Sequence, residues 1–169
     1  MSVNSLTKVD WALVLVAWIA ALLVGALVME HAFDMAPCPL CLMQRAWFII
    51  AGLFVLIGLL DHPERGIYPL LTLLAALLGG IFAARHVWIL TLPPDAVPAC
   101  LAPFEDLIEW GEWEKALASM TFGTAECGAE GAEDTFLGVH LAVWALGGFL
   151  AIAAGAVMQW RAPSGAARR

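Results

Sequence analysis

The sequence predicts an all-α membrane protein, a bundle of four transmembrane helices with one long outer loop. Of its 169 residues, 62% are hydrophobic and only 14% are charged, whereas about 25% of an average soluble domain is charged. Four apolar runs dominate the chain, and a helix needs about 20 such residues to cross a bilayer. Little chain remains beyond these runs, so we expect one membrane domain over residues 1–169 without an internal repeat. We predict spans at about 11–29, 42–60, 66–90 and 136–160, with outer loops at 30–41 and 91–135.

The first span contains no charged residue from Trp11 to Met29. Lys8 precedes it, as a basic residue precedes the apolar part of a signal peptide. The run is longer than the usual hydrophobic region of such a peptide, and no clear small-residue cleavage motif follows. We therefore expect a retained membrane helix.

The second span must begin before its strongly apolar part. The uncharged run Ala46–Leu60 covers only about 22 Å at 1.5 Å per residue, less than the hydrocarbon thickness of about 30 Å. The helix should therefore extend backward past Arg45. Pro37 and Pro39 limit this extension, because proline is tolerated only in a first helical turn. Cys41 is then expected in the first turn at the membrane surface, with Arg45 one turn deeper on the same face.

The third and fourth spans rest on two further apolar runs. Gly66–Ala84 is uncharged, and Thr135–Trp160 contains only His140 as an ionisable group. The glycine pairs at 79–80 and 147–148 allow the backbones of membrane helices to approach closely. We therefore expect these helices to pack tightly in the bundle.

The long outer loop lies between the third and fourth spans. It begins with the proline-rich stretch LPPDAVPAC, which favours extended chain. The following stretch PFEDLIEWGEWEKALASM has short apolar stripes on different faces. We expect one or two short helices on the membrane surface, with Trp110 and Trp113 as interfacial anchors.

Basic residues predict the orientation of the chain. With four spans, both termini share a side with the short second connection, and this side carries more Lys and Arg than the other. The positive-inside rule therefore places the termini in the cytoplasm. The basic residues are Lys8, Arg65, Arg161, Arg168 and Arg169 on this side, and Arg45, Arg85 and Lys115 on the other. The net charge of −7 argues against a nucleic-acid partner.

All four cysteines fall on the outer side, where an oxidising compartment such as the bacterial periplasm lets disulfides persist. They are Cys38, Cys41, Cys100 and Cys127. The pair in the long loop fits either of two interpretations. It could be a staple that closes the loop, or an exchangeable disulfide exposed to attack by an outside thiolate, which the flanking glycines would favour.

The CxxC has the features of a reactive thiol site. The positive end of a helix and the neighbouring Arg45 both favour the thiolate form of Cys41. The cysteine spacing does not fit a zinc ribbon, and Leu42 does not fit the CxxCH motif of haem attachment. We therefore expect no metal, while a purely structural disulfide between Cys38 and Cys41 remains an alternative.

These motifs occur in a particular order along the chain. PCPLCLMQR follows the first span, RHVWIL ends the third, two cysteines lie in the second outer loop, and FLG precedes the fourth span. The order resembles that of the DsbB-type disulfide bond formation proteins of the bacterial inner membrane and covers almost the whole chain. Its most specific element is the CxxC-x-x-Q-R that opens a second membrane helix.

The resemblance implies a quinone-dependent oxidoreductase that generates disulfides, with its cysteine loops in the periplasm. Cys100 and Cys127 would form the disulfide that accepts electrons from a DsbA-like thioredoxin-fold oxidase, with Cys100 in the mixed disulfide. Cys127 would then attack Cys38. Cys41 would be released and would pass the electrons to ubiquinone or menaquinone from the membrane quinone pool.

The same resemblance places Arg45 and His86 in the quinone site with Cys41. His86 could also belong to an interfacial belt, as we interpret Glu30 and His31 at the end of the first span. Two other functions stay open. A vitamin K epoxide reductase-like enzyme is disfavoured because its loop cysteines precede a CxxC in a later helix. A non-catalytic four-span scaffold with structural disulfides is the second.

Overall fold

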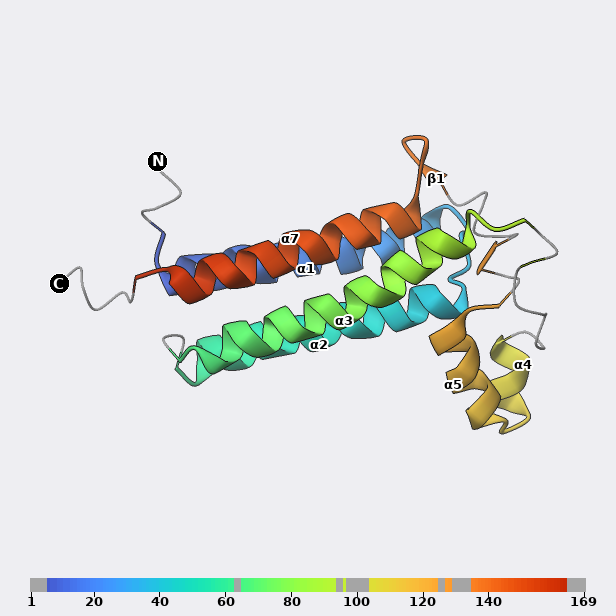
Figure 1. The fold of residues 1–169 in the computed structure, drawn as a ribbon, viewed down its shortest axis with the longest axis horizontal. Helices are drawn as coiled ribbons and strands as arrows, with labels where there is room; N and C mark the ends of the chain where they lie inside the picture. Colours follow the sequence, from blue (N-terminus) through green and yellow to red (C-terminus); the bar gives the residue numbers. More distant parts are fainter. Residues whose placement is uncertain are drawn as a thin grey trace.

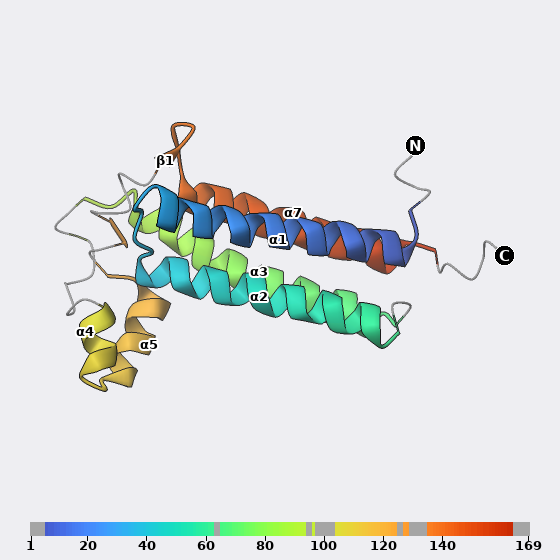
Figure 2. The same ribbon diagram turned by 180° about the vertical axis from the view of Figure 1, so that it is seen from behind.

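Four long helices lie side by side along the long axis of the molecule in a computed structural model (Figures 1 and 2). The structure describes residues 6–62, 65–93, 96, 104–124, 127–128 and 135–163. Each of the four helices is long and apolar enough to cross a membrane. They are α1 (Lys8–Ala32), α2 (Pro39–Leu60), α3 (Ile67–Ile89) and α7 (Leu141–Arg161). The prediction of an all-α four-helix membrane bundle is confirmed.

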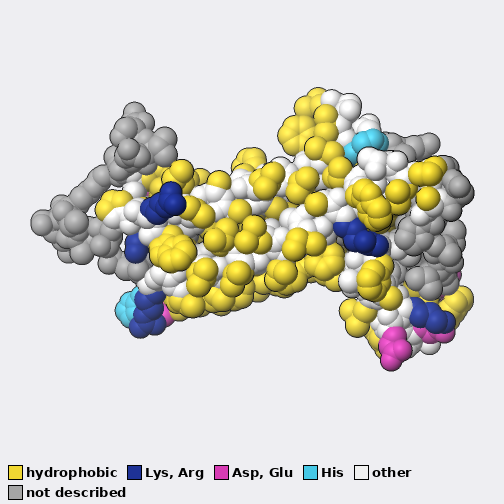
Figure 3. All heavy atoms as spheres, in the orientation of Figure 1, with side chains coloured by type: hydrophobic (Ala, Val, Ile, Leu, Met, Phe, Trp, Pro, Cys, Tyr) yellow, Lys and Arg dark blue, Asp and Glu magenta, His cyan; other side chains and the backbone are white. Residues whose placement is uncertain are grey.

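The helices pack as a ring in which α3 contacts α2 and α7, and α1 contacts the same two helices from the other side. Small side chains and a few large ones fill the centre. The core consists of Ala12, Leu15, Ile19, Phe48, Ala51, Val55, Ala75, Ala76, Ala83, Phe149 and Ile152. Large apolar side chains such as Leu53, Leu77 and Leu150 point outward and are about half exposed or more. Charged and histidine side chains gather toward the two ends of the bundle (Figure 3), as a bilayer solvent requires.

Local chemistry fixes where two of these helices begin. Thr7 caps α1 through a reciprocal pair of hydrogen bonds with Asp10, a capping box. Cys38 is the N-cap residue of α2, and Pro39 occupies the first helical position, where its missing N–H costs nothing. The second helix therefore starts slightly earlier than the predicted span, and Cys41 lies in its first turn as expected.

The fourth membrane helix, α7, begins at Leu141, later than the predicted start of the fourth span at residue 136. The residues before it form an antiparallel hairpin, in which β1 (Thr135–Phe136) pairs with β2 (Val139–His140). Leu137 and Gly138 have φ angles of 56° and 77°, which a helix does not contain but a two-residue hairpin turn requires. Because this segment is largely apolar, its hydropathy does not reveal the turn.

In the described part of the outer loop, two short helices, α4 (Phe104–Glu109) and α5 (Trp113–Phe122), lie beside the outer end of α2 (Figure 1). Trp110 and Trp113 are mostly exposed, in keeping with their predicted place at an interface. Arg85 of α3 holds the end of α5. Its Nε donates a hydrogen bond of 2.9 Å to the Phe122 carbonyl oxygen, and its guanidinium lies against the Phe122 and Trp88 rings.

Gly79 lets α3 approach both neighbouring helices. A Cβ atom at this position would overlap the Phe149 ring and lie 2.8 Å from Trp47 Cβ. Phe149 cannot easily move, because it is fully buried and stacks on Phe48 at 3.9 Å between ring centroids. We therefore expect Gly79→Ala to lower the free energy of unfolding in detergent by about 1–3 kcal/mol. Gly147→Ala is the matched control, since nothing lies within 4 Å of its added Cβ. Equal stability of the two variants would contradict this packing.

Candidate functional site

The two cysteines of the CxxC lie at the outer end of α2, where the bundle meets the loop helices. Cys38 and Cys41 are both partly buried, and their Sγ atoms are 3.3 Å apart. A disulfide has an S–S distance of about 2.0 Å. Only a small side-chain movement therefore separates the geometry of the two thiols from that of a disulfide.

His86 of α3 lies directly against this pair. Its Nε2 is 3.8 Å from Cys38 Sγ, and its Nδ1 is 3.9 Å from Cys41 Sγ. The ring is almost fully buried, because α3 packs along α2 at this level. The structure thus places His86 at the sulfur atoms and within the bundle, not in an exposed interfacial belt.

Gln44 is a site residue for which the sequence analysis gave no role. Its Nε2 lies 3.2 Å from His86 Nδ1, and its side chain is buried. The amide therefore orients the imidazole ring from the helical turn below Cys41. A signal was present, because an uncharged polar residue is unusual among the apolar residues that open a membrane helix.

Cys127 approaches the CxxC from the long loop. It is completely buried with Leu40 and Ile89, and Cys38 packs against this cluster. Gly123, with φ 76°, allows the chain to turn in after α5, since a Cβ there would lie 2.6 Å from Ile89 Cδ1 and 2.8 Å from Leu40 Cδ1. Cys127 itself is therefore not exposed to an outside thiolate. Cys100 lies outside the described residues.

The environment favours the protonated thiols of Cys38 and Cys127. The thiol contact with Cys38, followed by burial, raises the pKa of Cys127 strongly. The contact with Cys127 lowers the pKa of Cys38, but the neighbouring Cys41 and burial outweigh it, so the pKa of Cys38 is raised overall. Exchange between these two sulfur atoms should therefore accelerate as the pH rises and more thiolate forms.

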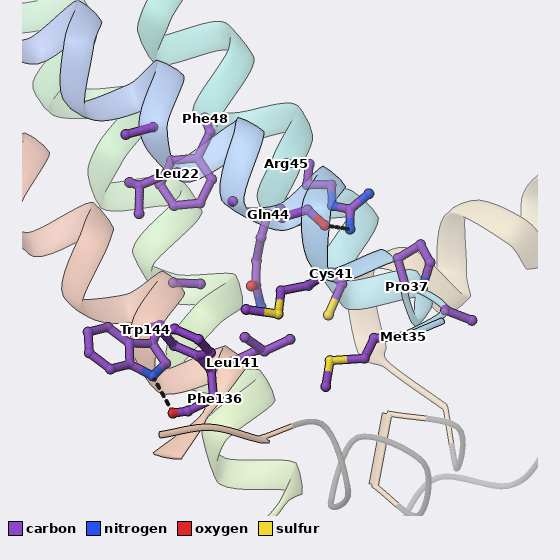
Figure 4. Close-up of a pocket in the computed structure, with 16 residues that line it drawn as sticks. Leu22, Met35, Pro37, Cys41, Gln44, Arg45, Phe48, Phe136, Leu141 and Trp144 are labelled. Atoms are coloured by element: carbon purple, nitrogen blue, oxygen red, sulfur yellow. Dashed lines mark hydrogen bonds between the residues drawn. The ribbon is translucent and has the colours of Figure 1, made fainter. Parts of the chain in front are cut away.

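Arg45 lies one turn below Cys41 and is held by two groups from α1. It forms an ion pair with Glu30. Its Nη2 also donates a hydrogen bond of 3.2 Å to the Ala26 carbonyl oxygen (Figure 4). Both side chains are partly buried, which strengthens such a pair relative to one on an open surface. Glu30 is thus more than an interfacial residue, because it fixes the direction of the Arg45 side chain.

A cavity of about 300 Å³ opens beside Cys41, between α1, α2 and α7. Its wall is mostly apolar, and the side chains of Cys41, Gln44 and Arg45 supply the polar groups (Figure 4). The lining residues are Ala21, Leu22, Gly25, Ala26, Met29, Met35, Ala36, Pro37, Cys41, Gln44, Arg45, Phe48, Phe136, Leu141, Trp144 and Ala145. An apolar cleft with a few convergent polar groups is the usual form of a small-molecule site.

The hairpin forms one edge of this cavity. Trp144 Nε1 donates a hydrogen bond of 3.2 Å to the Phe136 carbonyl oxygen, and the two rings meet edge to face. Both residues line the cavity, whereas His86 does not. Among the described residues, Cys41 and Gln44 connect His86 to this cavity.

A second apolar cavity, of about 190 Å³, lies deeper between α1 and α2. The described residues in its wall include no ionisable or thiol group. The lining residues are Val16, Ile19, Ala20, Leu23, Ile49, Gly52, Leu53 and Leu56. It therefore offers room for an apolar molecule but no group that could exchange electrons with it.

Comparisons with known proteins show which family the chain resembles. Residues 8–159 match the family model described as disulfide bond formation protein DsbB. Disulfide bond formation protein B 1 of Pseudomonas aeruginosa is 35% identical over 153 residues, which cover 88% of this chain and 93% of that protein. Disulfide bond formation protein B of Hahella chejuensis is 36% identical, covering 84% and 87% of the two chains. The protein of the same name from Azoarcus sp. is 39% identical, covering 81% and 82%. No solved structure gives a significant match.

Proposed function

The chain belongs to the DsbB family of disulfide bond formation proteins, a family of multi-pass membrane oxidoreductases, and we propose that it reoxidises a DsbA-like periplasmic thiol oxidase and passes the electrons to a membrane quinone. One observation supports this more than any other. Cys38 packs against the cluster that contains Cys127, and Cys41 lines the cavity, so the CxxC connects the two. Electrons that arrive from the loop at Cys38 can therefore leave from Cys41 into the cavity.

Electrons would move from the reduced partner to Cys41 by a series of thiol–disulfide exchanges. A thiolate of the reduced partner attacks Cys100 of the Cys100–Cys127 disulfide, and a second partner thiolate resolves the mixed disulfide, so the partner leaves oxidised. The freed Cys127 attacks Cys38 of the Cys38–Cys41 disulfide. A Cys38–Cys127 bond forms, and Cys41 is released as a thiolate. Attack of the Cys100 thiolate on Cys127 then re-forms the Cys100–Cys127 disulfide and frees Cys38, and a two-electron oxidation joins Cys38 and Cys41 again. The contact between Cys127 and Cys38 supports this order of attack.

The cavity beside Cys41 fits a quinone head group in size and chemistry. A planar, mostly apolar ring with polar oxygen atoms suits an apolar wall in which Arg45 and Gln44 supply donors. Bound there, a ubiquinone or menaquinone would supply the two-electron oxidant. Arg45 would hold negative charge on the Cys41 side of the cavity, and the apolar wall would exclude water.

We propose that the protein lies in the bacterial inner membrane with its termini in the cytoplasm. The starts of α1 and α3 and the ends of α2 and α7 lie at one end of the bundle, and the CxxC lies at the other (Figure 2). The bias of Lys and Arg toward the first end supports this orientation. The cysteine-bearing loops would then face the periplasm.

Arg45 is expected to determine how well quinone is used. Charged hydrogen bonds contribute about 1.5–3 kcal/mol, so Arg45→Ala should raise the KM for quinone about tenfold or more. Glu30→Gln should raise it less, because the guanidinium remains but loses its charged partner. Arg65→Ala is the control, since Arg65 pairs with Asp61 at the opposite end of the bundle. The measurement is quinone reduction in detergent, and an unchanged KM in Arg45→Ala would remove Arg45 from the site.

An assay with a reduced thioredoxin-fold oxidase and a soluble quinone tests the function itself. We expect thiol loss from the oxidase that depends on both the quinone and this protein. If the protein and quinone together cause no thiol loss above background, the proposal is contradicted. That result would favour the alternative of a membrane scaffold whose disulfides are structural.

A further inference from the structure

Three metal-ligating side chains converge at the outer end of the bundle. The ligand atoms of Cys38, Cys41 and His86 lie within 4.8 Å of one another. The two Sγ atoms are 3.3 Å apart. Cys38 Sγ lies 3.8 Å from His86 Nε2, and Cys41 Sγ lies 3.9 Å from the other ring nitrogen, Nδ1. A tetrahedral zinc site, with Zn–S of about 2.3 Å and Zn–N of about 2.0 Å, places its ligand atoms roughly 3.5–3.8 Å apart. Because one cation takes a single ring nitrogen, the ligand atoms need to shift by about 1 Å or less to reach this arrangement.

The cysteine spacing predicts no metal, but from this geometry we infer that the dithiol form of the protein binds one thiophilic divalent cation, Zn²⁺ or Cd²⁺, through Cys38, Cys41 and His86. Binding involves no electron transfer. The cation replaces the two thiol protons, and one nitrogen of the neutral imidazole completes three protein ligands. The disulfide form offers no thiolate, so the site exists only after the CxxC has been reduced.

The surroundings of the cluster support a cation site. Two thiolates and a divalent cation are neutral together, which suits a partly buried position at a membrane surface better than two bare thiolates. Ligating histidines are usually held through their other nitrogen, and the Gln44 amide is already 3.2 Å from His86 Nδ1. Because Gln44 can present its carbonyl oxygen to an Nδ1–H, His86 Nε2 would remain free for the cation. Cys127 contacts Cys38 but lies outside the cluster.

Metal binding at this cluster would stop the proposed electron transfer. A Cys41 thiolate bound to a d¹⁰ cation is no longer free to give up its electrons, so the protein would be held in its reduced form. Removing the cation with a chelator would restore the electron transfer. The inference goes beyond the proposed function, because binding can be measured on the reduced protein with neither quinone nor partner present.

The test is a titration of Cd²⁺ into the reduced full-length protein in detergent. Binding is measured at each addition as the ultraviolet absorption of the cadmium–thiolate bonds. Cys100→Ser combined with Cys127→Ser is the background, so that Cys38 and Cys41 are the only thiols. We expect one cation per chain. His86→Ala should weaken the affinity about 100-fold or more, since even the loss of a group that merely orients a ligand costs 10–100-fold. His31→Ala is the matched control, as its exposed ring bonds to the Leu27 carbonyl oxygen away from the cluster.

Two results would overturn the inference. One is equal affinity in the His86→Ala protein and its background, and the other is equal binding by the oxidised protein. Circular dichroism of each variant shows whether its helices are intact. Should the double serine background fail to fold, competition of the reduced natural chain with a chromophoric zinc chelator gives the same comparison. The natural chain must then bind Zn²⁺ far more tightly than its His86→Ala variant.

Discussion

The Cys41→Ser protein is expected to reduce quinone at least about 1,000-fold more slowly than the parent, as when an enzyme loses its nucleophile. Of the cysteines that the structure describes, Cys41 is the one that lines the large cavity. A serine hydroxyl neither forms a disulfide nor ionises near neutral pH, so no electron pair can reach the cavity. The measurement is quinone reduction driven by a reduced thioredoxin-fold oxidase.

The same variant carries an internal control for folding. Without Cys41, the thiols of Cys38 and Cys127 are left in contact with one another. Mild oxidation should therefore trap a Cys38–Cys127 disulfide, which peptide mapping without reductant detects. Trapping combined with lost quinone reduction is the expected pair of results. Quinone reduction close to that of the parent would show that another group hands over the electrons.

Cys100→Ser is expected to block oxidation of the partner while the CxxC stays oxidisable by quinone. Cys127 is completely buried, so a partner thiolate cannot reach it in place of Cys100. Partner turnover should fall at least about 1,000-fold, in line with the loss of an essential reacting group. A chemically reduced CxxC should still be reoxidised by soluble quinone at the rate of the parent.

The contrast between these two half-reactions separates a relay from a single redox centre. If Cys100→Ser oxidises the partner as fast as the parent does, the loop pair is not part of the pathway. The partner would then react directly with the CxxC. If instead both half-reactions fail, the substitution has disturbed the bundle and the helical content of the variant should be reduced.

The helices of the bundle were predictable because each rests on a local pattern. Uncharged runs of bilayer length mark the spans, and the shortness of Ala46–Leu60 required α2 to begin near the CxxC. The four-residue separation of Cys41 and Arg45 then placed both on one helical face, and both line the cavity. Local geometry was enough for this half of the site.

The other half depends on which helices are neighbours, and hydropathy does not specify that. His86 meets the sulfur atoms because α3 packs on α2, and Glu30 meets Arg45 because α1 packs on the other side of α2. The burial of Cys127 depends on the turn at Gly123, inside a loop whose composition indicated only surface helices. Contacts of this kind join residues far apart in the sequence.

We propose that electrons leave Cys41 into a quinone held in the cavity between α1, α2 and α7. Labelling with a photoreactive quinone, followed by mass spectrometry of the cross-linked peptides, locates the bound quinone. We expect adducts at residues that line this cavity, such as Met29, Arg45 and Trp144, and fewer adducts in Arg45→Ala. Adducts confined to Val16, Leu53 and Leu56, which line the second cavity away from any sulfur atom, would contradict this proposal.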